Sequence, residues 1–343
     1  MKIVAFAAAA LSTVLVSSFA SETFAYKLNP LVDRNKGGDN RWALSLSDTV
    51  HEDITHAAIA CAEGPRSSAN ASGPWCGTEV VRPASGAPGN INNAMIRGVW
   101  WNDDPNQLLN FPNHLTWATR MKIGERIARR RPGSIGGTYR MQHRSHYGDL
   151  QFLHAMANND GETAADTQRR ILEWMQFAYQ IALNRISPQT RLGQIDLPVT
   201  RNAFRNQRGW TVDYLFAPVY RLDPVGDVAL GSMLHAVQDS YAAGHAKRAF
   251  GSSPACPAGR VVQFHSFVKQ DSDAHGVEDL RTALTRDMTE RFTPGNNPVE
   301  ASARLIAFVR RRADWETEVE PYLRNNLFCI DSDAELSGPG RFE

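Results

Sequence analysis

The sequence lacks an excess of charge of either sign. Its 343 residues carry 37 Lys and Arg against 36 Asp and Glu, a formal net charge of +1. Proteins that bind nucleic acid through many phosphate contacts are clearly basic, so we expect no stable nucleic-acid partner. Charged residues make up 21% of the chain and hydrophobic residues 42%. This composition is typical of a folded globular protein and excludes a mainly disordered one.

Long apolar runs are also scarce, and the one that stands out lies at the N-terminus. Lys2 is followed by an apolar run over 3–16 and then by small residues up to Ala20. The run is shorter than the roughly 20 residues that cross a bilayer, and the pattern is typical of a cleaved export signal. We therefore expect residues 1–25 to be a signal peptide and the mature protein to be secreted or periplasmic.

Cysteine is rare, with four residues in the whole chain. In an exported protein this number suggests two disulfides, and we favour Cys61–Cys76 and Cys256–Cys329 among the three possible pairings. The alternative is buried free thiols.

Strand patterns and internal repeats are lacking, whereas apolar residues recur at helical spacing in many segments. The sequence therefore predicts an all-α fold with long irregular loops. The loops are expected over 63–98 and 186–224, the second with a short hairpin around 210–220. We expect residues 26–343 to form one monomeric domain that ends, over 298–343, in a closing helix and tail. Helices are predicted over 47–61, 114–131, 162–184, 227–242, 274–292 and 298–325.

The most informative segment is GSMLHAVQDSYAAGH. His235 and Asp239 are four residues apart in a helical pattern, so their side chains project from one face. Apolar neighbours place that face in the interior, where a carboxylate needs a partner cation. His245 follows just beyond the expected helix end and can join the same site.

A second segment repeats this spacing. His275 and Asp279 are again four residues apart within an expected helix. Imidazole and carboxylate ligands in this mixture suit Zn²⁺. Two such pairs together with His245 exceed what one ion needs, so the sequence predicts more than one zinc ion.

Three further segments can contribute ligands from separate helices and loops. His51 lies in the first expected helix. A carboxylate, Asp103 or Asp104, follows a Trp pair. His146 and His154 precede the long expected helix, and the one that is not a ligand could contact a ligand or phosphate from the second shell.

The remaining histidines carry weaker signals. We expect His56, His114 and His143 to be ordinary surface or core residues. His265 lies in an apolar, strand-like run and is the least clear of them.

These motifs resemble the zinc-dependent phospholipase C family, which shares its fold with the P1 nucleases, and specifically its exported bacterial type. The match rests on His235-x-x-x-Asp239-x-x-x-x-x-His245 and on the later His-x-x-x-Asp pair, in the family's order. It also includes His51 in H-x-x-I-T, the W-x-D setting of Asp103, and His154 ahead of Asp-Gly and a long helix. The matched segments extend from about residue 42 to 280.

The resemblance implies a helical bundle with three zinc ions in one cleft. It assigns one zinc ion to Asp103, His154, His235 and Asp239. It assigns a second to His245, His275 and Asp279. A third would take His51, with Asp239 as a bridge to the first. In the family, an N-terminal Trp also binds the third zinc. The nearest candidate here is Trp42, but the expected cleavage does not make it the first residue of the mature chain.

The activity that follows from the resemblance is that of a phospholipase C. We expect hydrolysis of phosphatidylcholine or a similar phospholipid to diacylglycerol and a phosphorylated headgroup, with transient membrane-surface contact. Asp103 would orient or deprotonate the attacking water in addition to binding metal. Two alternatives remain: a P1-like zinc nuclease or nucleotidase that acts on single-stranded nucleic acid, and an exported protein with structural zinc only.

Overall fold

The structure is a computed structural model that describes residues 49–63, 94–108, 114–216, 224–251, 256 and 259–343. The expected signal peptide, Trp42 and Cys76 lie outside the described residues. Of His114, only the backbone is described.

The described chain is mainly helical, with a single two-stranded antiparallel sheet, so the mainly helical prediction is confirmed. No described helix combines the length and apolar character of a membrane span. The α-helices are α2 (Val50–Glu63), α3 (Ala94–Trp101), α4 (His114–Arg130), α5 (Met141–Tyr147), α6 (Ala164–Ala182), α7 (Pro198–Asn202), α8 (Val212–Phe216), α9 (Val225–Asp239), α10 (Ser272–Val277), α11 (Arg281–Glu290), α12 (Pro298–Arg310) and α13 (Glu320–Tyr322). The 3₁₀ and π segments are η4 (Gln151–His154), η5 (Leu192–Gln194), η6 (Trp315–Val319), η7 (Leu323–Leu327) and η8 (Gly340–Phe342), and the strands are β1 (Ala246–Ala249) and β2 (Arg260–Phe264).

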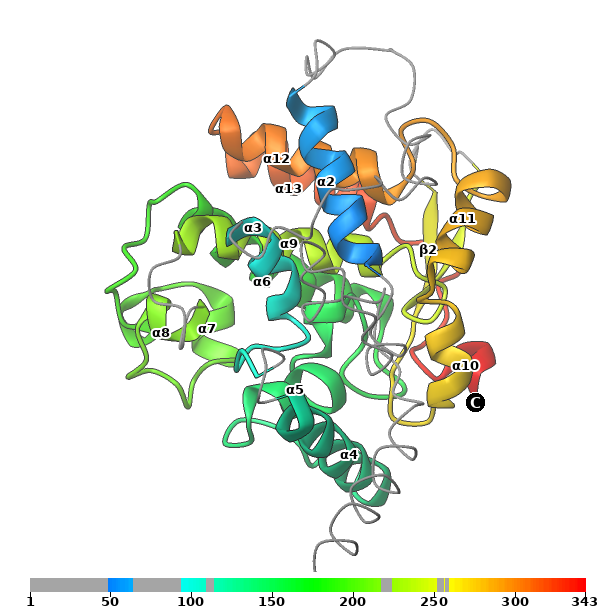
Figure 1. The fold of residues 1–343 in the computed structure, drawn as a ribbon, viewed down its shortest axis with the longest axis horizontal. Coiled ribbons are helices and arrows are strands. Elements are labelled where there is room, and N and C mark those ends of the chain that lie inside the picture. Colours follow the sequence, from blue (N-terminus) through cyan, green and yellow to red (C-terminus); the bar gives the residue numbers. More distant parts are fainter. Residues whose placement is uncertain (1–48, 64–93, 109–113, 217–223, 252–255, 257–258) are drawn as a thin grey trace, which may run out of the picture.

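Helix α9 forms the centre of the molecule. Its sequence, VGDVALGSMLHAVQD, is apolar on nearly every side, which is typical of a helix buried all round. It packs against α3, α6 and α12, and also contacts η4 and α2. Figure 1 shows α9 in the middle, with α4 and α5 below it, α7 and α8 to the left, and α10, α11 and β2 to the right. The polar residues of α9 therefore face other elements and not water.

Two glycines allow α3 and α9 to approach closely. A Cβ atom on Gly98 would lie 2.8 Å from the Cα of Gly231, and one on Gly231 would lie 2.6 Å from the Cα of Gly98. Both contacts involve backbone, which cannot move aside easily. The backbones of the two helices therefore meet, and the residues at the end of α3 are held beside those of α9.

Helix α6 confirms the prediction over 162–184. Thr163 caps its N-terminus by accepting a hydrogen bond from the backbone N–H of Asp166. Its buried face includes Trp174, which stacks on Trp101 with ring centroids 5.4 Å apart. This packing fixes the C-terminal end of α3 against α6.

The prediction of a single helix over 274–292 is wrong. The chain forms α10 and α11 instead, with Glu278 as the C-cap of α10 and Leu280 as the extended N-cap of α11. Asp279 lies in the turn between them and not on a helix. The reason is local: the extended backbone of Leu280 (φ −77°, ψ 155°) interrupts the helical hydrogen bonds.

Three other expectations also need correction. The helix expected over 298–325 ends at Arg310, and a π-helical segment begins at Trp315 after Asp314 caps it. The hairpin expected around 210–220 is replaced by α8, although Thr211 forms an isolated bridge with Arg191. The loop expected over 63–98 is helical from Ala94.

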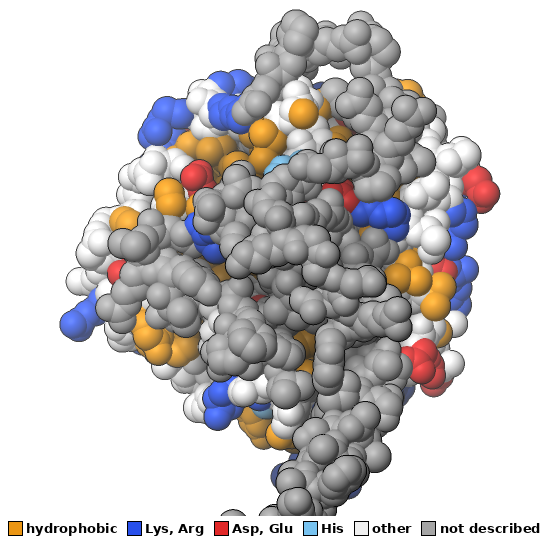
Figure 2. All heavy atoms as spheres, in the orientation of Figure 1, with side chains coloured by type: hydrophobic (Ala, Val, Ile, Leu, Met, Phe, Trp, Pro, Cys, Tyr) orange, Lys and Arg blue, Asp and Glu red, His pale blue; other side chains and the backbone are white. Residues whose placement is uncertain are grey.

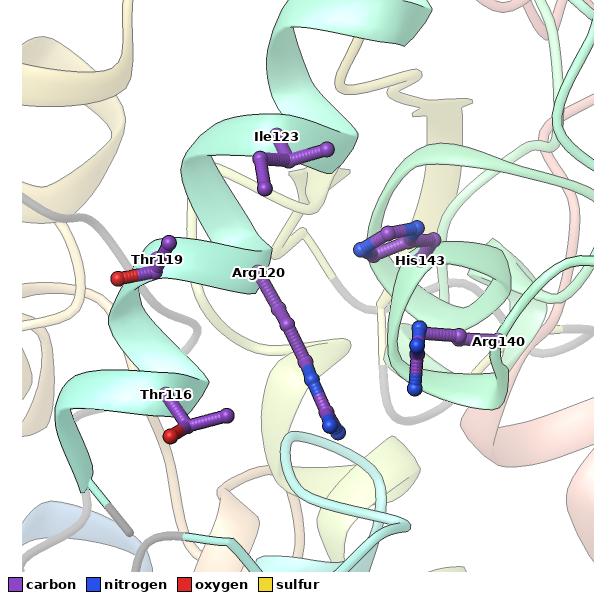
Figure 3. Close-up of a pocket in the computed structure, with 6 residues that line it drawn as sticks. All are labelled: Thr116, Thr119, Arg120, Ile123, Arg140 and His143. Atoms are coloured by element: carbon purple, nitrogen blue, oxygen red, sulfur yellow. The ribbon is translucent and has the colours of Figure 1, made fainter.

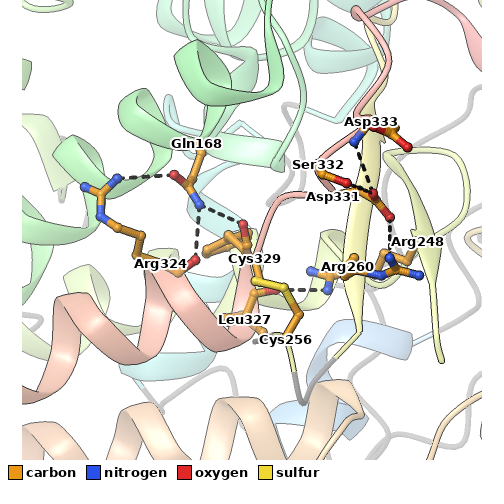
Figure 4. Close-up of a disulfide and its surroundings, with 11 residues drawn as sticks. Gln168, Arg248, Cys256, Arg260, Arg324, Leu327, Cys329, Asp331, Ser332 and Asp333 are labelled. Carbon is orange, nitrogen blue, oxygen red and sulfur yellow. Dashed lines mark hydrogen bonds and ion pairs between the residues drawn. A yellow bond between two sulfur atoms is a disulfide. The ribbon is translucent and has the colours of Figure 1, made fainter. Parts of the chain in front are cut away.

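The C-terminal segment is attached to the sheet by a disulfide. Cys256 and Cys329 are bonded, as predicted, over a sequence separation of 73 residues. Figure 4 shows Gln168 of α6 beside this bond, where its Nε2 donates to the carbonyl oxygen of Phe328 at 2.8 Å. Cys61 is also disulfide-bonded. Its predicted partner is Cys76.

Charged side chains of both signs are mixed around the rim of the described surface (Figure 2). This distribution matches the near-zero net charge.

Candidate metal centre

The fold brings all eight predicted ligands into the interior around the C-terminal end of α9. They come from α2, the turn after α3, η4, α9 and the segment after it, and the region of α10. Each is at most 3% exposed. Their ligand atoms form four groups in which all atoms lie within 4.8 Å of one another, and each group could hold a metal ion. The groups are His51, Asp103 and His235; Asp103, His146 and His154; His154, His235 and Asp239; and His245, His275 and Asp279.

The tightest of these groups joins η4 to α9. Asp239 Oδ2 lies 2.9 Å from His154 Nδ1 and 2.9 Å from His235 Nε2. The two ring nitrogens are themselves 3.0 Å apart. Neighbouring ligands of a tetrahedral zinc ion are about 3.3 Å apart for bonds of about 2.05 Å, so this spacing suits ligands of one ion.

The other nitrogen of each ring is occupied by a backbone carbonyl. His235 Nδ1 donates to Val99 O at 2.7 Å, and His154 Nε2 donates to Asn102 O at 3.2 Å. A carbonyl oxygen can only accept, so these nitrogens carry the protons of the neutral rings. His154 Nδ1 and His235 Nε2, which face each other and Asp239, then carry lone pairs. Such nitrogens can bind a cation placed between them and the carboxylate.

Two further histidines follow the same pattern. His245 Nδ1 donates to His154 O at 2.7 Å, and His146 Nδ1 donates to Gln142 O at 2.9 Å. In both rings Nε2 is left to face the carboxylates. His146 Nε2 lies 3.3 Å from Asp103 Oδ1, and His245 Nε2 lies 3.8 Å from Asp279 Oδ1.

The last two histidines of the centre are oriented by glutamines. His51 Nδ1 lies 2.6 Å from Gln238 Oε1, and His275 Nδ1 lies 2.6 Å from Gln270 Oε1. The orientation of Gln270 is well defined, because its Nε2 donates to the carbonyl oxygen of Gly244 at 2.8 Å. Its Oε1 must therefore accept from His275, and His275 Nε2 faces Asp279 Oδ2 at 3.3 Å.

Several buried atoms of the centre make no hydrogen bond within the described part of the chain. They include Asp103 Oδ2, Asp239 Oδ1 and His245 Nε2. Leaving such atoms without partners is costly. Each belongs to one of the four groups described above, so the donor set fits metal ions bound at these positions.

The electrostatics keep the carboxylates ionised. Burial alone would raise the pKa of Asp239, but the electrostatic interactions of its carboxylate with His235 and His245 outweigh this effect and hold the pKa well below its usual value. Burial opposes ionisation of Asp103 in the same way, and its interactions with His235 and His146 lower its pKa. Ionised carboxylates are the form that binds a cation.

The histidines divide into two kinds. Burial lowers the pKa of His235 to about 4 and that of His275 well below its usual value, so both rings are neutral at neutral pH. Burial also disfavours protonation of His51 and His154, but their hydrogen bonds with Asp239 outweigh it and raise both pKa values. The neutral ring is the form that coordinates a metal, so metal binding competes with protons at these two positions.

The geometry bears on two choices of ligand, Asp103 or Asp104 and His154 or His146. Asp103 belongs to two groups, whereas Asp104 is buried but belongs to none of them. His154 and His146 both reach the centre, and both form a group with Asp103. His146 therefore lies close enough to serve as a ligand and not only as a second-shell contact.

His265 is buried beside the centre but belongs to none of the four groups. Its Nδ1 donates to Gly244 O at 3.1 Å, and its backbone N–H donates to His245 O at 2.9 Å.

Sequence reasoning missed several residues that position the ligands. Asn102 is buried, and its Nδ2 donates to Leu153 O at 2.6 Å and to Ser232 O at 3.2 Å. These bonds tie the turn that carries Asp103 to η4 and α9. Gln238 was also missed, although its place beside Asp239 in the best motif could have drawn attention to it.

No protein-family model, no curated protein and no solved structure matches this chain. The resemblance to the phospholipase C family therefore stays a prediction.

Proposed function

We propose that this chain is an exported zinc-dependent phosphodiester hydrolase, a phospholipase C that cleaves phosphatidylcholine or a similar phospholipid. One observation carries the proposal: the buried lone-pair donors of His154, His235 and Asp239 converge within 3.0 Å of one another. A second group, at His245 and its neighbours, lies next to it. The sequence motifs and their family resemblance supply the substrate class.

The ligand chemistry favours zinc. Imidazole nitrogens with carboxylate oxygens and no thiolate are typical of catalytic zinc sites. In the proposed centre, His154, His235 and Asp239 hold one ion, and His245, His275 and Asp279 hold another. His51 and Asp103, which lie in a group with His235, are available to a third.

The chemistry supplied by bound zinc is the activation of water and the neutralisation of charge on the phosphate oxygens. The chain itself contributes Asp103, whose Oδ2 has no hydrogen-bond partner among the described residues. This atom can orient the attacking water and accept its proton. His146 Nε2 lies 3.3 Å from Oδ1 of the same carboxylate, so the two side chains can face one ion. Water attacks phosphorus directly, so the mechanism needs no Ser or Cys nucleophile.

The test compares two substrates. We expect the purified protein to release phosphocholine from phosphatidylcholine vesicles, to lose this activity with a chelator, and to regain it with Zn²⁺. Release of nucleotides from single-stranded DNA in place of phosphocholine would support the nuclease alternative. A protein that carries zinc but cleaves neither substrate would support a structural role and contradict the proposal.

A further inference from the structure

A separate pocket of about 450 Å³ lies between α4 and α5. Figure 3 shows the side chain of Arg120 extending from α4 into the space between these elements, with Arg140 and His143 on the other side. The residues that line the pocket are Thr116, Thr119, Arg120, Ile123, Arg140 and His143. None of them belongs to a metal-binding group.

The pocket carries two like charges. No ion pair joins Arg120 or Arg140 to another residue in the described ranges, whereas several other arginines there, such as Arg129 and Arg144, have one. Burial and the charge of Arg140 lower the pKa of Arg120, and the charge of Asp104 opposes this only in part. Two guanidinium groups that face one space without a bridging carboxylate repel each other, and an anion between them would remove this repulsion.

His143 forms part of the pocket wall and is 6% exposed. Its Nε2 is shielded from solvent, so the ring shapes the wall, and the two guanidinium groups are the donors that a ligand in the pocket can reach.

The rim of the pocket is partly apolar. Ile123, which lines the pocket, is 46% exposed. Exposed apolar side chains beside basic ones are typical of surfaces that meet lipid headgroups. The pocket is therefore suited to an anionic group at the boundary between water and an apolar phase.

We propose that this pocket is a second, metal-independent binding site for a phosphate group, presented by a lipid headgroup or as free phosphate. Arginine is the side chain best suited to phosphate, because its planar guanidinium donates two parallel hydrogen bonds to it. The hydroxyl of Thr116, which is exposed on α4, can add a further donor. The site goes beyond the proposed hydrolysis, since it would attach the protein to phosphate-bearing surfaces without cleaving them.

The experiment uses two double variants of the full chain. Arg120→Gln with Arg140→Gln removes both pocket charges. Arg126→Gln with Arg130→Gln removes two exposed charges from the same helix that do not line the pocket, and so matches the change in net charge. Circular dichroism and zinc content confirm that both variants are folded and loaded, which separates this test from that of the proposed function.

Two probes are then compared at constant ionic strength. Inorganic phosphate is titrated by calorimetry. Vesicles of digalactosyl diacylglycerol, with and without phosphatidic acid, are tested by co-sedimentation. We expect the pocket variant to bind phosphate at least about tenfold more weakly than the wild type, and the control to stay within about twofold.

The outcomes separate the sources of the phosphate. If the pocket variant also loses binding to phosphatidic acid vesicles, the site takes lipid headgroups. If only inorganic phosphate binding falls, the site takes free phosphate. Equal affinities of the pocket variant and the wild type for both probes, or equal losses in both double variants, would overturn the proposal.

Discussion

At the scale of single residues, the metal centre depends on hydrogen bonds that fix which nitrogen of each ring faces inward. Backbone carbonyls perform this task for His146, His154, His235 and His245. Such bonds prevent a ring from presenting an N–H group to the ligand position. The centre is therefore built from residues that hold ligands in position as well as from the ligands themselves.

Asp239 is the carboxylate that lies among the largest number of the histidines. Four histidine nitrogens lie within 3.6 Å of its carboxylate. We predict that Asp239→Asn removes at least one zinc ion per chain and lowers hydrolysis by about a thousandfold or more, because the neutral amide cannot offset the charge of the ions. Zinc content by mass spectrometry and phosphocholine release measure the two effects. His56→Ala, outside all four groups, serves as the control and should keep both. Normal zinc content and activity in Asp239→Asn would contradict the multi-zinc centre.

Gln238 tests the role of an orienting residue. Its Oε1 accepts from His51 Nδ1, and its Nε2 donates to Thr55 Oγ1 at 2.9 Å. Gln238→Leu removes the acceptor and should weaken zinc binding by about 10- to 100-fold. Gln238→Glu keeps an acceptor, and the hydroxyl of Thr55 can turn to donate to it, so this variant should retain most of the affinity. Competition with a fluorescent zinc chelator gives both values, and equal losses in the two variants would mean that His51 does not depend on this bond.

The burial of His265 leads to a prediction about how the free energy of unfolding depends on pH. Burial lowers its pKa from 6.5 to about 4 in the folded chain. Because the folded pKa is depressed, the neutral buried ring contributes stability above pH 6.5, and this contribution is lost as the pH falls towards 4. The full difference is roughly 3 kcal/mol. His265→Asn can still donate to Gly244 O but does not titrate, so urea unfolding should show a smaller loss of stability than in the wild type between pH 6.5 and 4. The same loss in both proteins would contradict this assignment.

At the scale of elements, the contact between α3 and α9 sets the geometry of the site. Asp103 follows α3, whereas His235 and Asp239 lie on α9. The two helices can meet closely only because Gly98 and Gly231 face each other. Any residue that separates these helices also separates their ligands.

Gly231→Ala therefore has two expected effects. The added methyl would overlap the backbone of α3, which should lower the free energy of unfolding by about 1–3 kcal/mol and weaken zinc binding. Gly209→Ala is a suitable control, because its added Cβ would meet nothing within 4 Å. Its stability should stay within about 0.5 kcal/mol of the wild type. Urea unfolding compares the two, and an unchanged Gly231→Ala would mean that the helices adjust without cost.

At the scale of the whole molecule, the proposed ions would cross-link segments that are far apart in the sequence. The ligands extend from His51 to Asp279 and belong to elements on several sides of α9. An ion that binds only the folded chain stabilises it in proportion to the logarithm of its concentration over the dissociation constant. The centre should therefore act on global stability as well as on activity.

Removal of zinc with EDTA should lower the free energy of unfolding by about 4 kcal/mol for free zinc at about 1,000 times the dissociation constant. Calorimetric melting with and without EDTA measures this loss. Added Zn²⁺ should restore the melting temperature and Mg²⁺ should not, because Mg²⁺ prefers oxygen ligands. A protein that loses all its metal and melts at the same temperature would contradict the proposed role of zinc.

The sequence by itself determined the mainly helical class, favoured the pairing of Cys256 with Cys329, and indicated the residues that meet at the candidate centre. It could do so because His235 and Asp239 share a helical face, and because apolar neighbours require that face to be buried. Local spacing was a weaker guide for His275 and Asp279, which meet at 3.3 Å even though Asp279 lies beyond the helix end.

Only the tertiary structure decided how these residues combine. The approach of His146 to Asp103 and the glutamine that orients His51 join segments that are distant in sequence. The periodicity of apolar residues indicates which face of a helix is buried, but it does not indicate which other helix covers that face. The partner depends on the packing of the whole chain, and so do the groups that hold each ligand in place.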